Sequence, residues 1–464
     1  MRKISKISLV AAVAVAGFST ANAQPLEQAI KDVEVSGSVV YRYDNFHNAE
    51  KFSIDENGNR ILTSERQNTD KNNYKIGLNL GSKVNDYVKF NSRFIVGSKD
   101  NAGFASLNSG KETTTRNGAE DNTKGNDGQA DVSLSNAYFG LTAIPNTVVN
   151  IGKQGLTTPY TVATDINGNE QTGTGILALT TVGPVTGGLG YFNNTNLDKS
   201  TEINSTLGYG TGSSTKTFRS GDSAYGLING GQDIYVATLQ GNLDLVKLEA
   251  WYLGHQENFN TYTLAATSNI DLASDAKIGL EARYVNLKLT NDGVNGIANQ
   301  IDPTGLLVTG NDIERDNSMF RLAADGKFNI VNARLAYTKT GKDGGLTALD
   351  QDAKNTSLGW ALSSNGVADA DYWQAALGAD ILDNLNFTLN YGNLKSGEVE
   401  ATRTKAQVLV SDIKAQETYG QLTYKMSKNL NTYLRYGTVE IKENSTGNKL
   451  IDQNRGRIQV AYSF

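Results

Sequence analysis

The 464-residue sequence carries a formal net charge of −5 and is 38% apolar, below the roughly 45–50% of a typical soluble domain. It contains no cysteine, which excludes disulfides and thiolate metal sites, and the acidic balance without a basic cluster argues against nucleic-acid binding. Glycine is abundant at 48 residues, whereas proline is scarce at 5. This composition favours long strands and tight turns, with one apolar face in place of a large apolar core.

Residues 1–23 have the order of features found in a secretory signal. Basic side chains precede an apolar run at 7–18, and Ala-Asn-Ala at 21–23 supplies a small-x-small cleavage pattern. We therefore predict a mature chain from Gln24, with a periplasmic N-terminal segment at 24–32. No later run reaches about 18 apolar residues, so such an exported chain could cross a membrane only as a closed barrel of strands.

Alternating segments separated by short turn sequences predict an all-β fold over residues 33–464. Eight turns account for sixteen strands, and the first (33–44) and last (455–464) bring the number to about eighteen. An even number of strands places both termini of the chain on the same, periplasmic, side of the barrel. The predicted turns are 84–86, 144–146, 183–187, 241–244, 272–275, 329–332, 382–384 and 427–429.

Long polar segments rich in Gly, Asn, Asp and Thr connect the hairpins at the opposite side. We predict that they are extracellular loops, as in transmembrane barrels with short periplasmic turns. They are also the segments that would contact host surfaces or antibodies. The predicted loops are 45–73, 99–130, 193–232, 291–317 and 340–370.

Within the predicted strands, apolar and charged residues alternate with a period of two. In one strand Val246, Leu248 and Tyr252 form an apolar row, whereas Lys247 and Glu249 form the other row. An apolar row against membrane lipid and a charged row in a wet lumen describe a transmembrane antiparallel β-barrel. The alternative is a soluble sandwich, in which apolar rows would be buried against each other.

The final strand repeats this pattern and ends on an aromatic residue. Ile458 and Tyr462 lie on the apolar face, and Arg455 and Arg457 lie on the polar face. The ending resembles the closing strand of bacterial outer-membrane barrels, which the assembly machinery reads as an export address. Tyr462 and Phe464 are therefore the predicted export signal.

Three stretches resemble the Campylobacter-type major outer membrane porin family. They are residues 25–37 followed by Tyr-Arg-Tyr-Asp at 41–44, the Ile-Gly-Lys-Gln-Gly-Leu sequence at 151–156 with Gly-Thr-Gly at 173–175, and the terminal alternation. The resemblance implies an 18-stranded homotrimeric barrel in the bacterial outer membrane. It also implies a water-filled channel through which ions and small hydrophilic solutes diffuse passively.

The resemblance places an inward constriction loop at 156–173, with Asp165 and Glu170 as its acidic residues. Carboxylates facing a basic wall would create a transverse field in which polar solutes align. The alternative is that both acidic residues lie on an ordinary outward loop. The predicted basic pore-lining residues are Arg42, Lys89, Arg93, Arg283, Arg321 and Arg334.

Residues 165–170 present alternating oxygen-bearing side chains, as calcium loops do. The spacing is not that of an EF-hand, because Gly168 occupies the fourth position instead of the sixth. The resemblance implies calcium at the constriction, yet the family's acidic position corresponds to the neutral Asn167, a weaker ligand. The candidate calcium ligands are Asp165, Asn167 and Asn169, and no cofactor is required for a channel.

No catalytic set is apparent, so we do not expect an enzyme. The only histidines, His47 and His255, fall in a loop and at a strand end, and no acid–base pair stands out. Three functions remain open. They are a general diffusion porin, a sugar-type selective channel with Trp251 and Tyr160 as candidate aromatic contacts, and an adhesin or structural outer-membrane protein.

Overall fold

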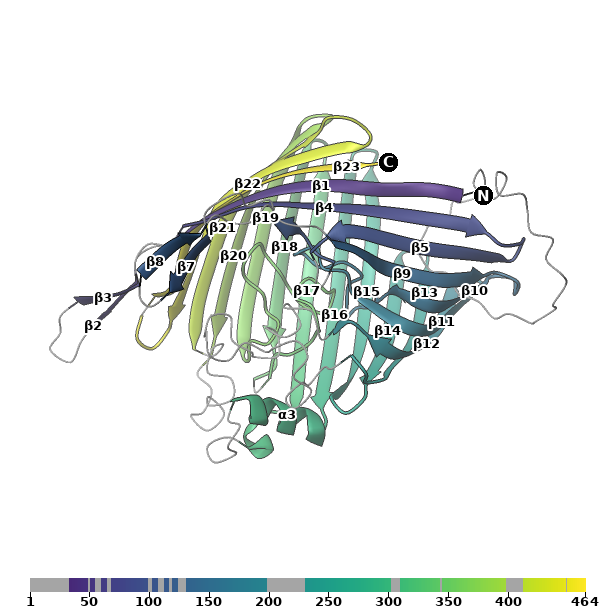
Figure 1. Ribbon diagram of the computed structural model, residues 1–464, viewed down its shortest axis with the longest axis horizontal. Coiled ribbons are helices and arrows are strands. Elements are labelled where there is room, and N and C mark those ends of the chain that lie inside the picture. Colours follow the sequence, from purple (N-terminus) through teal and green to yellow (C-terminus); the bar gives the residue numbers. More distant parts are fainter. Residues whose placement is uncertain are drawn as a thin grey trace.

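A computed structural model shows one antiparallel sheet closed into a barrel (Figure 1). The predicted signal (1–23) and periplasmic segment (24–32) lie outside the described residues. In the part of the chain that is described, no helix has the length and apolar character of a membrane span. The structure describes residues 33–48, 51–54, 60–64, 68–98, 102–106, 112–116, 119–123, 131–197, 230–301, 309–342, 344–397, 412–447 and 449–464.

Within those ranges, the barrel sheet consists of eighteen long strands and one two-residue strand, β6 (Ala105–Ser106), which confirms the predicted number. The long strands are β1 (Val33–Asn48), β4 (Asn68–Lys83), β5 (Val88–Gly97), β9 (Asp131–Leu141), β10 (Thr147–Gly155), β11 (Thr172–Val182), β12 (Val185–Thr195), β13 (Ile234–Leu243), β14 (Val246–His255), β15 (Phe259–Ala273), β16 (Ala276–Leu289), β17 (Asp316–Phe328), β18 (Val331–Thr340), β19 (Ala370–Leu382), β20 (Leu385–Ser396), β21 (Ile413–Lys425), β22 (Leu430–Glu443) and β23 (Lys449–Ser463). Two hairpins, β2 (Lys51–Ile54) with β3 (Arg60–Ser64) and β7 (Glu112–Arg116) with β8 (Ala119–Thr123), extend beyond the barrel wall in Figure 1.

Strand β1 closes the barrel, because it pairs with β4 on one side and with the last strand, β23, on the other. The terminal residue extends this seam. Gly37 donates its N–H to the carbonyl of Phe464 at 2.9 Å, and Phe464 donates to the carbonyl of Gly37 at 3.1 Å. A Cβ at Gly37 would lie 2.6 Å from the Phe464 ring, so this close approach requires glycine.

The two faces of the wall differ as the alternation predicts. On β14, Leu248 and Tyr252 are each 44% exposed on the outer face, whereas Glu249 and Leu253 are buried on the inner face. The outer apolar rows are therefore uncovered by any second sheet in the described chain, and the soluble-sandwich alternative is wrong.

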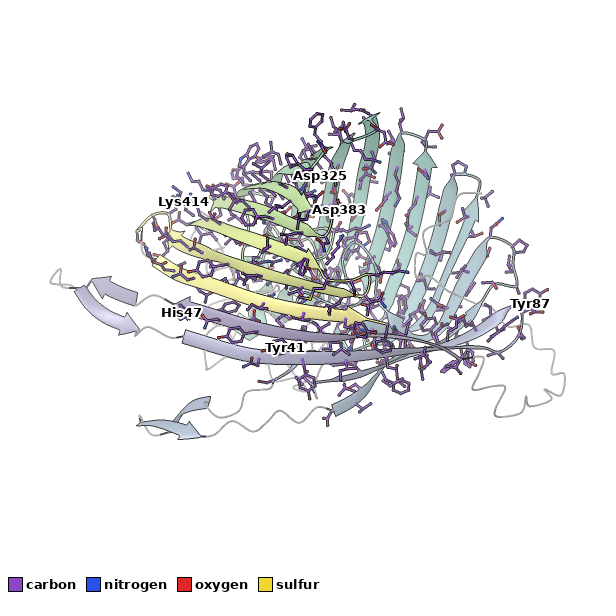
Figure 2. All side chains as sticks on the ribbon, turned by 90° about the horizontal axis from the view of Figure 1, so that it is seen from above. Tyr41, His47, Tyr87, Asp325, Asp383 and Lys414 are labelled. Atoms are coloured by element: carbon purple, nitrogen blue, oxygen red, sulfur yellow. The ribbon has the colours of Figure 1, made fainter. Side chains whose placement is uncertain are left out.

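All eight predicted turns join consecutive strands, and their residues supply the backbone conformations that tight turns need. Asn146, Asp244 and Asn329 have φ angles of 56°, 43° and 50°, in the left-handed region that Asn and Asp tolerate. In Figure 2, His47 and Lys414 lie at one end of the molecule and Tyr87, in the turn after β4, lies at the other. Short turns thus occupy one rim and the longer connections the other.

One long connection departs from its prediction as an extracellular loop. The segment between β18 and β19 (341–369) folds into the barrel, where Thr347, Asp350 and Asn355 have no exposed surface. Its apolar residues and buried amides contact the inner wall. The prediction was wrong because a Gly- and Asp-rich sequence does not show which wall residues will contact the loop. The connection between β10 and β11 (156–171) also folds inward, as predicted. We call these segments inward loop 1 (156–171) and inward loop 2 (341–369, described except at 343).

The connection between β16 and β17 contains the single turn η2 (Gly310–Asp312) and the helix α3 (Asn291–Ile301), and α3 lies at the loop rim (Figure 1). Large parts of the predicted loops 45–73, 99–130 and 193–232 lie outside the described residues.

Candidate functional site

The two inward loops contact each other inside the barrel. Leu349 donates its backbone N–H to the Tyr160 carbonyl at 2.9 Å, and Asn355 donates to the Pro159 carbonyl, also at 2.9 Å. A side chain adds a third link, since the Val162 N–H bonds to Oδ2 of Asp350 at 3.2 Å. The loops therefore form one partition across part of the lumen.

An apolar cluster anchors both loops to one side of the barrel. Leu156 and Tyr160 of inward loop 1 and Leu349 of inward loop 2 pack with inner-face residues of β12 to β17, among them Leu253 and Val285. Each buried side chain of this size contributes about 1.5–3 kcal/mol. This side of the lumen is filled, so polar and charged inner residues elsewhere are left to line the path.

Glu170 fastens inward loop 1 to the opposite wall. Its carboxylate is 2.6 Å from Nζ of Lys75 and 3.0 Å from Nε of Arg93, and the Ser135 hydroxyl donates to it at 2.7 Å. Burial alone would raise the pKa of Glu170, but the hydrogen bond from Arg93 and the charge of Lys75 outweigh burial and leave the pKa below its usual value. The residue is thus a charged clamp between β4, β5, β9 and the loop.

Asp165 stabilises the turn of inward loop 1 from within. Its Oδ1 accepts the backbone N–H groups of Asn167 and Asn169 at 2.9 and 2.8 Å, and its Oδ2 accepts the Asn169 amide at 2.7 Å. Donor hydrogens therefore point at both oxygens that calcium would need. Among the described residues no group of three or more His, Cys, Asp or Glu side chains could hold a metal. Calcium binding by Asp165, Asn167 and Asn169 stays a prediction; in this arrangement the Asp165 oxygens accept N–H groups of the turn.

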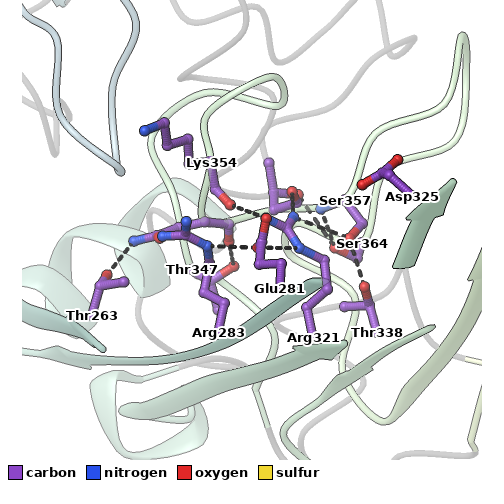
Figure 3. A network of polar contacts seen from close by, with 12 residues as sticks. Thr263, Glu281, Arg283, Arg321, Asp325, Thr338, Thr347, Lys354, Ser357 and Ser364 are labelled. Carbon is purple, nitrogen blue, oxygen red and sulfur yellow. Dashed lines mark hydrogen bonds and ion pairs between the residues drawn. The ribbon is translucent and has the colours of Figure 1, made fainter. Parts of the chain in front are cut away.

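Inward loop 2 is held on β16 and β17 by a network of arginines (Figure 3). Glu281 accepts from Arg283 at 3.0 Å and from Arg321 at 2.6 Å. Arg321 also donates to the Lys354 carbonyl at 2.8 Å, and Arg283 reaches the Asn355 amide oxygen at 3.4 Å. Both arginines therefore hold the loop, and because they share the single carboxylate of Glu281, the group keeps one net positive charge.

The tip of inward loop 2 contacts Glu417 on β21, two strands beyond β19 in the sheet. The backbone N–H groups of Trp360, Ala361 and Leu362 donate to its two carboxylate oxygens at 3.1, 2.8 and 3.2 Å. Glu417 is 3% exposed, and Gly359 lies so close that a Cβ there would overlap the carboxylate. A single inner-wall side chain thus fixes the end of the longest inward segment.

Five of the six predicted basic pore residues carry a carboxylate partner. Arg42 makes no ion pair with a described residue; it donates to Oε1 of Gln459 at 2.9 Å and to the Ile166 carbonyl at 3.1 Å. The paired residues are Lys89 with Glu34, Arg93 with Glu170, Arg283 and Arg321 with Glu281, and Arg334 with Asp325.

Two polar cavities, each of about 370 Å³, lie beside the inward loops. The first borders inward loop 2 and is lined by Arg321, Arg334, Asp352, Gln374 and Asn390, among others. The second borders inward loop 1, and its lining includes Asn79, Lys89, Arg93, Asn136 and Glu170. Of the predicted site residues, Arg321 and Arg334 line the first cavity, and Lys89, Arg93 and Glu170 line the second, where Arg93 and Glu170 are paired.

Five further residues that shape this region are not among the predicted site residues. Arg455 and Arg457 were visible on the polar face of the last strand, and Arg435 lies on the same inner row of β22. Asp350 and Glu417 gave no local signal, because their partners are about 190 and 55 residues away in sequence.

Acidification should shift the ion selectivity of the channel near pH 6. Burial, with a further contribution from the neighbouring Asp165 carboxylate, raises the pKa of Asp352 to about 6. Above that pH the side chain adds a negative charge to the first cavity, and below it the charge is lost. We expect cation preference, read from the reversal potential in a salt gradient, to fall between pH 7.5 and 5. In Asp352→Asn the step should be absent; a step of the same size in that variant would assign it to another group.

Comparisons with known proteins agree with this geometry. A family model described as Campylobacter major outer membrane protein matches residues 1–464, the whole chain. No curated protein matches the sequence.

Solved structures of outer-membrane proteins from Pseudomonas aeruginosa share the fold. OccK9 (OpdG) matches with a TM-score of 0.63 and 14% identity over 94% of this chain and 99% of that chain. OprD matches with a TM-score of 0.59 and 15% identity, over 93% and 95% of the two chains. OpdK with vanillate matches with a TM-score of 0.60 and 14% identity, over 93% and 98%.

Proposed function

We propose, from the premise that the chain belongs to the Campylobacter major outer membrane protein family, that ions and small hydrophilic solutes diffuse passively past its two inward loops. The protein is an outer-membrane porin, and its 18-strand barrel forms the channel. The observation that supports the proposed mode of transport is the pair of polar cavities beside the loops. Their charged and amide linings can replace the hydration of a small polar solute as it passes.

The proposal is tested by single-channel recording of the purified protein in planar bilayers. We expect a steady ohmic conductance in KCl, with reversal potentials that change when the inward loops are altered. Maltose and longer oligosaccharides should not produce saturable block. Saturable block by a sugar would favour a sugar-type channel, and conductance near zero would favour the adhesin or structural alternative.

The positions of the aromatic residues favour diffusion over sugar selectivity. Tyr160 is 1% exposed within the apolar cluster and receives a hydrogen bond from Thr263 at 2.8 Å. Trp251 packs against the same cluster. Neither ring is presented to the lumen as a stacking surface for a sugar.

Homotrimerisation remains part of the proposal. A groove of about 830 Å³ runs over the outer face of β11 to β15, where small side chains such as Ala178, Ala237 and Ala250 lie between exposed leucines. Small residues let neighbouring walls approach closely in lipid. Measuring the mass of the protein in a detergent micelle tests for the trimer, and the mass of a monomer would contradict the proposal.

The remaining expectations are also proposals. We propose that the protein is not an enzyme; His255 is 2% exposed and bonds to Asn258 at 2.8 Å, which leaves it unsuited to act on a solute. Hydrolase activity of the purified porin in a screen would contradict this proposal. We further propose that Tyr462 and Phe464 direct export and that the long loops face host surfaces or antibodies. Deleting Phe464 and following the surface-exposed protein tests the export role.

A further inference from the structure

A row rich in lysine crosses six neighbouring strands, β18 to β23, next to the loop rim. The strand registers define it, because Lys339 lies opposite Asp371, Asp371 lies opposite Lys395, and each later member lies opposite the next. Figure 2 shows Lys414 of this row at the same end of the molecule as His47. We call it the lysine row, and its members are Lys339, Asp371, Lys395, Lys414, Lys442 and Lys449.

The lysine row lies on the outer face of the barrel. On β19, Asp371 shares its face with Trp373, which is 49% exposed, whereas Tyr372 between them is buried. On β21, Lys414 is exposed and the next residue, Ala415, is buried on the inner face. The side chains of the lysine row therefore extend away from the lumen, towards whatever surrounds the barrel.

Aromatic residues mark the level of the lysine row relative to the membrane. Tyr337 and Trp373, whose ring centres are 4.6 Å apart, form the next row towards the turns, and Tyr391 lies one row further. Nearer the turns than Tyr391 and Tyr436, the outward-facing residues of these six strands carry no charge. Aromatic girdles lie at the edge of the apolar band, and rows are separated by about 7 Å. The lysine row thus lies at the level of the lipid headgroups.

The middle of the lysine row lacks compensating carboxylates. At its two ends, Lys339 and Lys449 each pair with two carboxylates at 2.6–3.0 Å, and Lys442 pairs with one at 2.5 Å. Lys395 and Lys414 lie directly opposite each other, and neither makes an ion pair with a described residue. Like charges that face each other across two strands repel and destabilise the sheet.

Another pair of facing lysines shows how the same barrel offsets such repulsion. Lys277 of β16 and Lys327 of β17 lie opposite each other near the turn rim. Lys277 lies 3.0 Å from Asp271, and Lys327 lies 2.8 Å from Asp380, so each ammonium group has a carboxylate of its own. The middle of the lysine row has no such carboxylate in the described chain. An anion from outside the chain would supply the missing negative charge.

We propose that the lysine row binds the phosphate groups of an anionic lipid in the outer leaflet of the membrane. The loop rim of such a barrel faces outwards, and lysine stems lie along apolar surface while their ammonium groups reach the headgroups. A phosphate between Lys395 and Lys414 accepts a charge-assisted hydrogen bond from each. The groove proposed for trimerisation lies over β11 to β15, which leaves the lysine row accessible to lipid.

The test measures the midpoint of thermal unfolding of the full-length protein in a non-ionic detergent, with lipid A as the probe. A ligand that binds only the folded state raises the midpoint with its concentration. Lipid A should raise the midpoint in a saturable manner. Lipid A without its phosphates, and inorganic phosphate at the same concentration, should leave it almost unchanged. A rise of equal size with dephosphorylated lipid A, or with inorganic phosphate, would overturn the proposal.

Variants assign the effect to the lysine row. In Lys395→Gln/Lys414→Gln the half-saturating lipid A concentration should rise about tenfold or more, because two lysines near an anionic headgroup are lost. Lys395→Arg/Lys414→Arg keeps both charges and should bind like the parent. The matched control is Lys277→Gln/Lys327→Gln, which removes the other facing pair and should also bind like the parent. An unchanged half-saturating concentration in Lys395→Gln/Lys414→Gln rejects the proposal.

The midpoint without lipid separates lipid binding from a structural role. If the two lysines serve the lipid, Lys395→Gln/Lys414→Gln should unfold at the same temperature as the parent or higher, since the repulsion between them is gone. A clearly lower midpoint would mean that they stabilise the barrel itself and would contradict the proposal. The result does not bear on the channel, because the lysine row lies outside the lumen.

Discussion

Replacing Glu417 with alanine is expected to raise the single-channel conductance and to make the open current noisier. Three backbone N–H groups at the tip of inward loop 2 lose their acceptors in this variant. Leaving buried donors unsatisfied costs about 1–3 kcal/mol each. A combined loss of only about 3 kcal/mol shifts the equilibrium between a docked and a released tip more than a hundredfold. The tip should therefore leave the wall and widen the path.

A second variant attacks the same contact from the loop. Gly359→Ala places a methyl group where the Glu417 carboxylate lies, so the tip can dock only by moving. It should reproduce the higher conductance although it changes no charge. Glu440→Ala is the control, since this glutamate pairs with Lys442 and Lys449 near the loop end of β22. If both tip variants conduct like the parent, inward loop 2 does not narrow the path.

Replacing Glu170 with glutamine is expected to lower stability and to release inward loop 1. The variant leaves Lys75, whose side chain is 7% exposed, buried without a counter-ion. Removing one partner of a buried ion pair typically costs about 3–5 kcal/mol. We expect a lower midpoint of thermal unfolding in detergent, together with a higher conductance as the loop leaves β4 and β5.

Two comparisons give this prediction its controls. Asp86→Asn breaks the Lys83–Asp86 pair, in which both side chains are largely exposed, and should leave the midpoint almost unchanged. Lys75→Gln/Glu170→Gln removes both buried charges and should recover part of the lost stability. A midpoint for Glu170→Gln equal to that of the parent would show that the clamp is not needed to hold the loop.

The wall of the barrel could be predicted because its information is local. In a strand such as β14, the alternation of Val246, Lys247, Leu248 and Glu249 predicts which side chains lie on each face. Asn, Asp or Gly residues likewise mark the position of each short turn. These signals depend on residues two to four apart. The strands and turns can therefore be predicted without knowing which strands are neighbours in the sheet.

The sequence predicted the inward loops only in part. Inward loop 1 was placed through a family resemblance, and its acidic residues were expected to face a basic wall across water. In the structure Glu170 bonds directly to that wall, and Asp165 turns inward upon its own loop. Inward loop 2 resembled an ordinary outer loop, because its Gly- and Asp-rich sequence does not reveal which wall will satisfy its amides.

The sequence alone therefore determined that the chain is a strand-rich barrel with apolar outer rows, a charged bore and eight tight turns, since a period of two and turn chemistry are properties of neighbouring residues. Only the tertiary structure decided which charges remain free. Ion pairing depends on side chains brought within about 4 Å by closure of the barrel and by docking of loops. Glu170 and Lys75 are 95 residues apart, and Arg457 and Asp44 are 413 apart, before folding places them in contact.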